Sequence, residues 1–555
     1  MSRAAGRGAG GSALPFAAVL LAAASVVSAQ APARLGKIDF PTSGSPEAQA
    51  PFRTGALLLH SFEFEDAAAA FRQAQEIQPG FAMAYWGEAM TYNHPLWAEQ
   101  DRDAALKALA KLGPSPEARR AKAPTPREKM YLDAVEALYA QGGGDKTARD
   151  RAYEEAMERL SAAFPDDLDA ASFYALSILG ACEGKRDTAR YMKAAAIVEE
   201  VFAKNPEHPG AAHYLIHCYD DPVHAPLGMR AARVYAQIAP AATHALHMPS
   251  HIFLASGMWP EVVSSNEASW KASVDRAERQ KLGPDAHSFH ALSWLEYGYL
   301  QQGRYADARN TLALMEKDAA AGASSGRATA GFVAMRAAYV VETRRWKGDA
   351  ADLKVPSDGM HRDLNLFVTG LAAIETGDRA GAEKSLAAMS SAGGAAAAPS
   401  AAHMHGAAAS SDASGRASAD TVLRQLLDAQ ILFSKGQRDR ALAAAKSAAA
   451  AEDGLNYEFG PPDVVKPAHE LLGEMLFAAG KAGDAREEFE AALARYPGRA
   501  LSLLGLARAA SKAGDAAAAR DAYGKLAAVW SRADADVPEL AEVRREAAVK
   551  VAGRP

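Results

Sequence analysis

The sequence of 555 residues has little cysteine and lacks one cofactor motif. Cys182 and Cys218 are its only cysteines, and no CxxCH motif is present. The missing motif excludes covalently attached haem. In an oxidising compartment the two thiols could form a disulfide. The alternative is that they are two small buried residues on neighbouring helices.

The chain also lacks an excess of either charge and lacks long apolar runs. It has 61 basic and 67 acidic residues, whereas nucleic-acid-binding domains and polybasic membrane surfaces carry a clear positive excess. We therefore expect no nucleic-acid partner. After Ala29, no stretch reaches the roughly 20 apolar residues that a membrane helix needs. We therefore expect no transmembrane segment.

The N-terminus has the pattern of an export signal. Arg3 and Arg7 precede an apolar run from Ala13 to Val27, and small residues follow as far as Ala29. We expect cleavage after Ala29, so that residues 1–29 are a signal peptide and the mature protein is periplasmic or secreted. Residues 30–50 are rich in Pro, Gly and Ser and are expected to form a flexible lead.

The composition predicts an all-α protein. Alanine dominates and β-branched residues are sparse, and Ala loses no side-chain entropy in a helix. Helical segments recur after turn glycines, most clearly after Gly303, Gly480 and Gly514, and the last two glycines are 34 residues apart. A 34-residue helix–turn–helix unit is typical of tetratricopeptide (TPR) repeats.

From about Pro51 to Ala547 the sequence resembles TPR proteins. The segments HPGAAHYLIH, HALHMPSHIF and GPPDVVKPAHELLGE resemble, more narrowly, a group of exported bacterial TPR proteins. The resemblance implies a TPR-type α-solenoid whose concave groove binds a protein or peptide. Residues 390–417, rich in Ala, Gly and Ser, cannot bury an apolar face. They are expected to be a flexible linker between an N-terminal array (51–389) and a C-terminal array (418–555).

Histidine is concentrated in two HxxxH pairs. His213 and His217 form the first pair, and His247 and His251 form the second. Each histidine of the second pair lies 34 residues after the corresponding histidine of the first. An HxxxH pair on a helix places both rings on one side, which is how two ligands of a zinc, iron or copper site are commonly supplied.

The resemblance to TPR proteins also implies which positions face the groove, namely those thirteen, ten and six residues before a turn glycine. Before Gly257 all three positions are histidine, and His290 lies thirteen residues before Gly303, with His287 on the same face. We therefore predict a transition-metal site formed by six histidines: His213, His217, His244, His247, His251 and His290. Asp221 and His224, just beyond the first pair, are candidate outer ligands.

Metal is one of several interpretations of this pattern. Several buried imidazoles without partners would cost free energy, so a metal ion, an anionic ligand or a carboxylate network is expected to compensate. A purely structural role is the remaining alternative. Tyr214 and Met248 occupy the places of the Glu in HExxH metalloproteases, which argues against that class. The choice between zinc, iron and copper stays open.

Two other segments carry candidate ligand-binding residues. Glu470 and Glu474 lie ten and six residues before Gly480, the positions that carry histidine upstream. They could face the histidine groove, or they could be a solvated carboxylate pair. The aromatic segment AYWGEAMTYNHPLW, from Ala84 to Trp97, could contact a ligand or could be packing.

These patterns predict an exported TPR binding or scaffold protein with a histidine-built metal site in its groove. The alternative is a metal-dependent enzyme, a hydrolase or oxidoreductase, that uses the same histidines with Glu470, Glu474 or Asp221 as general base. No catalytic residue is assigned from the sequence. An open coordination position beside a closed cavity would favour the enzyme, whereas a long open groove would favour the scaffold.

Overall fold

The computed structural model describes residues 34–140, 142–182, 186–321, 326–355, 361–390, 419–457 and 459–548. The chain divides into residues 1–33, which lie outside these ranges, and one compact unit of residues 34–555. The predicted signal peptide and nearly all of the predicted linker lie outside the described residues. Export and the division into two arrays therefore stay predictions.

The described residues form an all-α fold, as predicted. Its only strands in these ranges, β1 (Asn93–His94) and β2 (Glu99–Gln100), pair antiparallel. The helices of the first half are α1 (Pro46–His60), α2 (Phe64–Ile77), α3 (Ala82–Met90), η1 (Pro95–Trp97), α4 (Arg102–Leu112), α5 (Pro116–Arg120), α6 (Pro126–Tyr139), α7 (Lys146–Ala163), α8 (Leu168–Gly180), α9 (Thr188–Lys204), α10 (Pro209–Cys218), α11 (Ala225–Ile238), α12 (Thr243–His247), α13 (Pro249–Ala255) and α14 (Trp259–Gln280).

The remaining helices continue in the same manner. They are η2 (Pro284–Ala286), α15 (Phe289–Gln301), α16 (Tyr305–Ala320), α17 (Arg327–Thr343), η3 (Asp349–Asp352), α18 (Arg362–Glu375), α19 (Arg379–Ser390), α20 (Ala419–Ser434), α21 (Arg438–Asp453), α22 (Ala468–Ala478), α23 (Ala482–Arg495), α24 (Ala500–Lys512), α25 (Ala516–Val529), η4 (Trp530–Arg532) and α26 (Leu540–Ala548). Among the described residues, no helix is long and apolar enough to cross a membrane.

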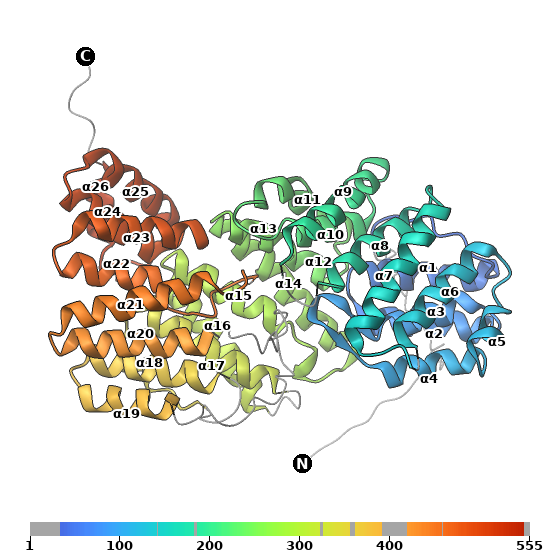
Figure 1. The fold of residues 1–555 in the computed structure, drawn as a ribbon, viewed down its shortest axis with the longest axis horizontal. Helices are drawn as coiled ribbons and strands as arrows, with labels where there is room; N and C mark the ends of the chain where they lie inside the picture. The colour runs from blue at the N-terminus through green and yellow to red at the C-terminus, as the bar shows by residue number, and fades with distance from the viewer. Residues whose placement is uncertain are drawn as a thin grey trace, which may run out of the picture. The chain divides into compact units, whose positions relative to one another are not determined.

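The helices form a TPR-type solenoid of helix–turn–helix repeats. Successive helices lie side by side in antiparallel pairs, most regularly from α20 to α25 (Figure 1). The predicted turn glycines adopt left-handed backbone angles, with φ of 67° at Gly257, 68° at Gly303, 82° at Gly480 and 83° at Gly514. Residues with a Cβ rarely adopt such angles. Glycine therefore marks the repeat boundaries for a conformational reason.

An aromatic residue of the second helix packs closely on the first helix of each well-formed repeat. Phe489 of α23 lies on Gly505 of α24, where an added Cβ would stand 2.3 Å from the ring. Phe71 of α2 lies in the same way on Gly87 of α3, also at 2.3 Å. Such close approach leaves no room for a side chain. The same packing unit therefore recurs at both ends of the described chain.

The apolar core consists of two clusters that meet at α14 and α15. One cluster runs from Leu35 to Tyr297, and the other runs from Val263 to Val543. The second cluster includes residues on both sides of the predicted linker. Within the described residues the core therefore divides at α14 and α15, the helices next to the histidine region.

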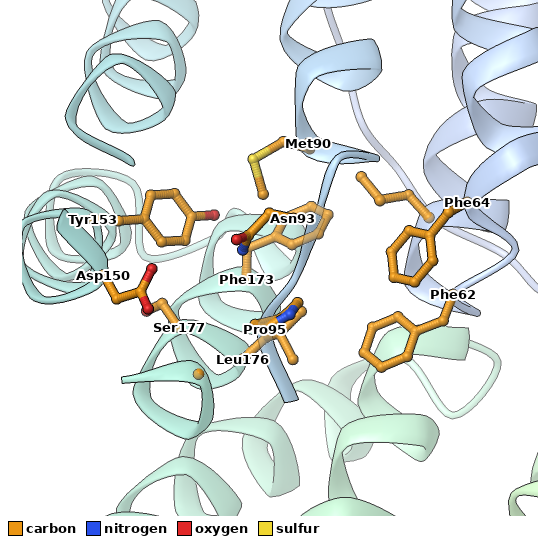
Figure 2. Close-up of a pocket in the computed structure, with 12 residues that line it drawn as sticks. Phe62, Phe64, Met90, Asn93, Pro95, Asp150, Tyr153, Phe173, Leu176 and Ser177 are labelled. Atoms are coloured by element: carbon orange, nitrogen blue, oxygen red, sulfur yellow. The ribbon is translucent and has the colours of Figure 1, made fainter. Parts of the chain in front are cut away.

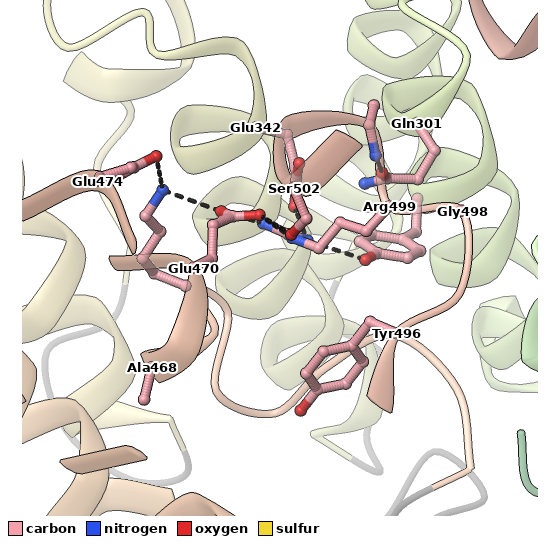
Figure 3. A network of polar contacts seen from close by, with 12 residues as sticks. Gln301, Glu342, Ala468, Glu470, Glu474, Tyr496, Gly498, Arg499 and Ser502 are labelled. Carbon is pink, nitrogen blue, oxygen red and sulfur yellow. Dashed lines mark hydrogen bonds and ion pairs between the residues drawn. The ribbon is translucent and has the colours of Figure 1, made fainter. Parts of the chain in front are cut away.

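A buried ionic network joins α22 and α24 to α15 and α17 (Figure 3). Arg499 is fully buried, and its guanidinium pairs with Glu470 at 2.7 Å and with Glu342. Lys466 donates hydrogen bonds to Glu470 at 2.9 Å and to Glu474 at 2.6 Å. Burial alone would raise the pKa of Glu470, but the charges of Arg499 and Lys466 outweigh it and lower that pKa. The network fastens helices that are distant in sequence.

Both cysteines are buried and free in this fold. The Cys182 thiol donates a hydrogen bond to the Ile178 carbonyl oxygen at 3.3 Å. Burial raises the pKa of the Cys218 thiol. The structure therefore agrees with the reading of two buried residues rather than a disulfide.

Replacing Arg499 with Leu should lower the free energy of unfolding by roughly 3–5 kcal/mol, because Glu342 and Glu470 would stay buried without their cation. Urea unfolding measures this change. Arg486→Leu is the matched control, since Arg486 pairs with Glu490 and Asp515 at the surface, and it should change stability by no more than about 0.5 kcal/mol. Equal effects of the two variants would contradict this role of Arg499.

Glu296 of α15 makes stability depend on pH. It is 1% exposed, and neither carboxylate oxygen has a hydrogen-bond partner among the described residues. Burial raises its pKa well above 4.5, and Arg309 opposes this only in part. In the pH range above 4.5 the folded chain therefore keeps a proton that the unfolded chain has lost, so the free energy of unfolding falls as pH rises.

Glu296→Gln should remove this dependence, because the amide stays neutral. The variant should gain stability relative to the unmodified chain between about pH 5 and pH 8, by up to roughly 1.4 kcal/mol per pH unit. Melting curves across this range, with the exposed Glu278→Gln as control, measure the difference. Parallel curves for the unmodified chain and Glu296→Gln would show that Glu296 does not titrate as described.

Candidate metal centre

Helices α10 and α12 bring three imidazoles together as a first triad, His213, His217 and His244. The Nε2 atom of His213 lies 3.0 Å from Nε2 of His217 and 3.1 Å from Nε2 of His244. Two imidazole nitrogens that bind one ion at about 2.0–2.1 Å with tetrahedral angles are roughly 3.3 Å apart. The first triad therefore has nearly the spacing of an occupied metal site.

A second triad consists of His247, His251 and His290, from the end of α12, from α13 and from α15. Nε2 of His247 lies 3.0 Å from Nε2 of His251, and the His290 ring centroid lies 4.4 Å from that of His247. One ring nitrogen from each of the three residues lies within 4.8 Å of the others. The structure thus divides the six predicted histidines into two sets of three.

The two triads are neighbours. Ring centroids are 5.8 Å apart between His217 and His251 and 6.2 Å apart between His244 and His247. Within the first triad, the ring centroids of His217 and His244 are 6.5 Å apart. The distances between the two triads are therefore no larger than a distance inside one triad. Two ions, one in each triad, would therefore be close enough to contact one small molecule.

The triads are built by the same rule. Each takes two histidines one helical turn apart, ten and six residues before the turn of one repeat. It takes its third histidine from the next repeat, thirteen residues before that turn: His244 before Gly257 and His290 before Gly303. The second triad is therefore a copy of the first, moved along the solenoid by one repeat.

Hydrogen bonds fix which ring nitrogen carries the proton. Nδ1–H of His213 donates to the main-chain carbonyl of His60 at 2.7 Å, and Nδ1–H of His247 donates to Asn266 Oδ1 at 2.6 Å. The Asn266 amide nitrogen donates to the Val262 carbonyl at 2.8 Å, which turns its oxygen toward His247. Outer partners of this kind orient metal-binding histidines.

His251 is held in the same way, because its Nδ1–H donates to the Asp220 carboxylate. A neutral imidazole carries only one N–H. The facing Nε2 atoms of His247 and His251 would therefore both present lone pairs, 3.0 Å apart. Facing lone pairs repel each other, so a cation must lie between them. That cation is either a metal ion or a proton on one imidazole.

Five of the six histidines are buried, with exposures from 0% for His213 to 8% for His217, and only His244 is half-buried. Aromatic rings cover both triads. Phe62, in the turn between α1 and α2, contacts His213 with ring centroids 4.3 Å apart, and Trp294 contacts His251 at 4.4 Å. Phe62 has a φ of 56°, an uncommon angle for a bulky residue and one that marks functional sites.

Glu63 follows Phe62 and lies beside the first triad. Its carboxylate accepts a hydrogen bond from the His244 main-chain N–H at 2.9 Å. Although part of the side chain is exposed, burial of the carboxylate raises its pKa to about 7, and hydrogen bonds from His244 and Thr243 oppose this only in part. Glu63 can therefore accept or release a proton near neutral pH.

A third group, His60, Asp169 and His208, is fully buried behind the first triad. Its ring nitrogens have other roles. His60 Nε2 lies 2.9 Å from Asp169 and its Nδ1 lies 3.0 Å from the Tyr214 hydroxyl, while His208 Nδ1 accepts the Ala211 N–H at 3.2 Å. His208 would lose this helix cap if its Nε2 bound a metal. The group is therefore a hydrogen-bonded support for the carbonyl that orients His213.

Asp169 is the charged centre of this support. Burial alone would raise its pKa, but the imidazoles of His208 and His60, whose Nε2 atoms lie 3.5 Å and 2.9 Å from Asp169 Oδ1, outweigh it and lower the pKa. Burial also lowers the pKa of His60. The carboxylate therefore stays ionised inside the protein because two imidazoles face it.

The other predicted ligand-binding residues lie outside both triads. His287 pairs with Asp318 at 2.7 Å, and His224 pairs with Asp221, which also pairs with Arg186. Glu470 and Glu474 belong to the Arg499 and Lys466 network rather than to the histidine groups. The aspartate that holds a site histidine is Asp220, the neighbour of the predicted Asp221.

A narrow hollow lies beside the first triad and is shown in Figure 2. Its walls come from the α1–α2 turn, from α3, α7 and α8, and from the aromatic segment noted in the sequence. Asn93 of that segment lines the hollow, whereas Trp86 is fully buried in the core. Phe62 lines the hollow as well and also contacts His213. One aromatic side chain therefore contacts both the hollow and the first triad.

Asp169→Asn should lower the free energy of unfolding by roughly 3–5 kcal/mol, because His60 and His208 lose a buried charged acceptor. It should leave the number of bound metal ions unchanged, because this group supports a ligand and is not itself a metal site. Chemical unfolding and metal analysis measure the two effects, with the exposed Asp166→Asn as control. A third bound ion that is lost in a folded Asp169→Asn chain would instead make Asp169 a ligand.

No protein-family model matches this chain, and no curated protein matches it. Among solved structures, it is similar to a Cut9–Hcn1 hetero-tetramer of the APC/C, with 13% identity, coverage of 91% of this chain and 97% of that chain, and a TM-score of 0.28. A human IFIT1 dimer with m7Gppp-AAAA has 11% identity, coverage of 90% and 92%, and a TM-score of 0.34. Yeast Tom70 has 12% identity, coverage of 90% and 94%, and a TM-score of 0.26. The function of the site is therefore inferred from its own geometry.

Proposed function

We propose that the paired histidine triads bind two copper ions and that the protein is an exported oxidoreductase. The observation that carries this proposal is the convergence of Nε2 atoms within two adjacent sets of three imidazoles. In both sets, Nδ1–H groups are committed to outer partners. This arrangement leaves lone pairs directed at a shared point, which is what a cation requires.

The donor set favours copper over the other metals considered. All six ligands are neutral imidazoles, which suit copper, zinc and iron, whereas Mg²⁺, Ca²⁺ and Mn²⁺ prefer carboxylates. Copper(II) also binds most tightly in the divalent series.

Three protein ligands leave each ion an open position, as in catalytic metal sites. A copper pair supplies two-electron chemistry: an organic donor loses two electrons and two protons, and dioxygen takes them up to become hydrogen peroxide. The chain's own residues hold the imidazoles in place, exclude bulk water and supply Glu63 as a group that exchanges a proton. Residues Phe62 and Trp294 provide the apolar cover.

Burial of the histidines supports an enzyme more than a scaffold. An open groove would leave the imidazoles exposed, whereas five of them are buried and a narrow hollow lies beside them. The helical array would then serve mainly to position ligands from successive repeats. The proposal also includes export to the periplasm and a partner protein or peptide in the concave groove.

A zinc hydrolase is the second candidate, and Glu63 is the observation that favours it. Its carboxylate accepts a hydrogen bond from the main-chain N–H of His244, and a carboxylate beside a metal site can act as general base for a bound water. The two candidates differ in metal preference. Exposure of metal-free protein to equal concentrations of copper and zinc, under reducing conditions, should yield a copper-loaded chain if the proposal holds and a zinc-loaded chain if the alternative holds.

The proposal predicts about two copper ions for each chain of untagged protein, one for each triad. The double variant His247→Ala, His251→Ala should lose one ion, and His213→Ala, His217→Ala should lose the other. Elemental analysis after desalting measures the content, and loaded protein should take up oxygen with ascorbate as electron donor.

Matched controls are His224→Ala and His287→Ala, which remove histidines outside the triads and should retain both ions. Less than about a tenth of an equivalent of transition metal, unchanged in the double variants, would refute the metal site. In that case the cation between the Nε2 atoms is a proton.

A further inference from the structure

The hollow in Figure 2 has one polar end and one apolar end. Tyr153 of α7 and Asn93 of β1 lie at the polar end, and Phe62 and Phe64 lie at the other. The Tyr153 hydroxyl points toward Asn93 and into the space between the walls. The walls between the two ends are mostly apolar and include Phe173 and Leu176, while Asp150 and Ser177 add polar groups to the lining.

Tyr153 is the feature of this hollow that points to a ligand. Its side chain is 5% exposed, and its hydroxyl has no hydrogen-bond partner among the described residues. A buried hydroxyl without a partner costs roughly 1–3 kcal/mol. Asn93, also 5% exposed, accepts a hydrogen bond from Gln100 through its oxygen at 3.0 Å. A polar group that enters beside Asn93 can therefore pair with Tyr153.

The apolar end leads to the histidines. The Phe62 ring lines the hollow on one side and contacts His213 on the other, with ring centroids 4.3 Å apart. Phe173 of α8 also lines the hollow and stacks on His60, 4.4 Å away, and His60 supplies the carbonyl that orients His213. A molecule in the hollow is thus separated from the first triad by a single aromatic ring.

We propose that this hollow binds a small organic molecule with an apolar body, no larger than a single ring, and one hydroxyl head group. The head group pairs with Tyr153, and the apolar end lies against Phe62, on the side of the histidines. Binding follows from the hollow alone. Its assignment as the substrate class of the metal centre rests on the proposed function.

The test uses two matched probes, 4-fluorobenzyl alcohol and 4-fluorotoluene, which differ by one hydroxyl. Fluorine NMR of the probes with the metal-free full-length chain measures their affinities. The alcohol should bind more tightly than 4-fluorotoluene. Tyr153→Phe should weaken binding of the alcohol about threefold to tenfold, the value of one hydrogen bond, and should leave binding of 4-fluorotoluene unchanged.

Tyr174→Phe is the control, because the Tyr174 hydroxyl pairs with Glu158 and does not line the hollow. It should change neither affinity. Leu176→Trp, which fills the hollow, should abolish binding of both probes in a chain that still melts cooperatively. The proposal is overturned if the alcohol does not bind at millimolar concentrations, if Leu176→Trp leaves binding intact, or if Tyr153→Phe affects both probes equally.

Failure of this test is separate from failure of the metal proposal. The probes are measured on metal-free protein, and copper content is measured without probes. A chain that binds two copper ions but no alcohol would keep the metal centre and lose this substrate class. A chain that binds the alcohol but no copper would keep the binding site and lose its assigned chemistry.

Discussion

The Nδ1 protons of three histidines, His213, His247 and His251, decide what the two triads can do. Three acceptors of different kinds hold those protons: the His60 main-chain carbonyl, the Asn266 side-chain amide and the Asp220 carboxylate. Because each acceptor fixes a tautomer, each Nε2 atom is left with a lone pair directed at its neighbours. Without these acceptors the rings could hydrogen-bond to one another as ordinary polar neighbours, and no cation would be required.

Distant parts of the chain are needed to keep those acceptors in place. His60 ends the first helix, and its position depends on the buried charge of Asp169 in α8. On the other side, Trp294 is covered by Gly460, where an added Cβ would stand 2.6 Å from the indole ring. The Arg499 network fastens the helices that follow Gly460 to α15 and α17. The two histidine triads are therefore held by contacts from both ends of the described chain.

The sequence predicted the repeat architecture and the six histidines because both depend on local spacing. A turn glycine indicates a backbone angle that few other residues adopt, and an HxxxH motif indicates two side chains one helical turn apart on the same face. The division into two triads was not predicted, because it depends on which rings converge after the repeats pack. Spacing selected Asp221, but the tertiary fold turns Asp220 toward His251.

Other differences between the spacing and the tertiary arrangement have the same origin. His287 shares a face with His290 only if the helix extends to it, but α15 begins at Phe289 and His287 pairs with Asp318 instead. Glu470 and Glu474 hold the same repeat positions as the histidines, yet they meet the buried cations of Lys466 and Arg499. Phe62 and Asn266 carried no motif, because an aromatic cover and an amide acceptor are ordinary residues until a fold places them.

The rule that builds each triad has a consequence for how such a centre can arise and be altered. Two ligands come from one repeat and the third comes from the next, so duplication of a single repeat would create a further complete set of donors beside the existing one. A chain with one histidine triad could thus gain a second triad in one genetic step. In the present chain the series stops at the repeat that turns at Gly303, where Ser293 and Tyr297 occupy the positions that a third histidine pair would need. Placing histidines there would supply a further pair of imidazoles to the row.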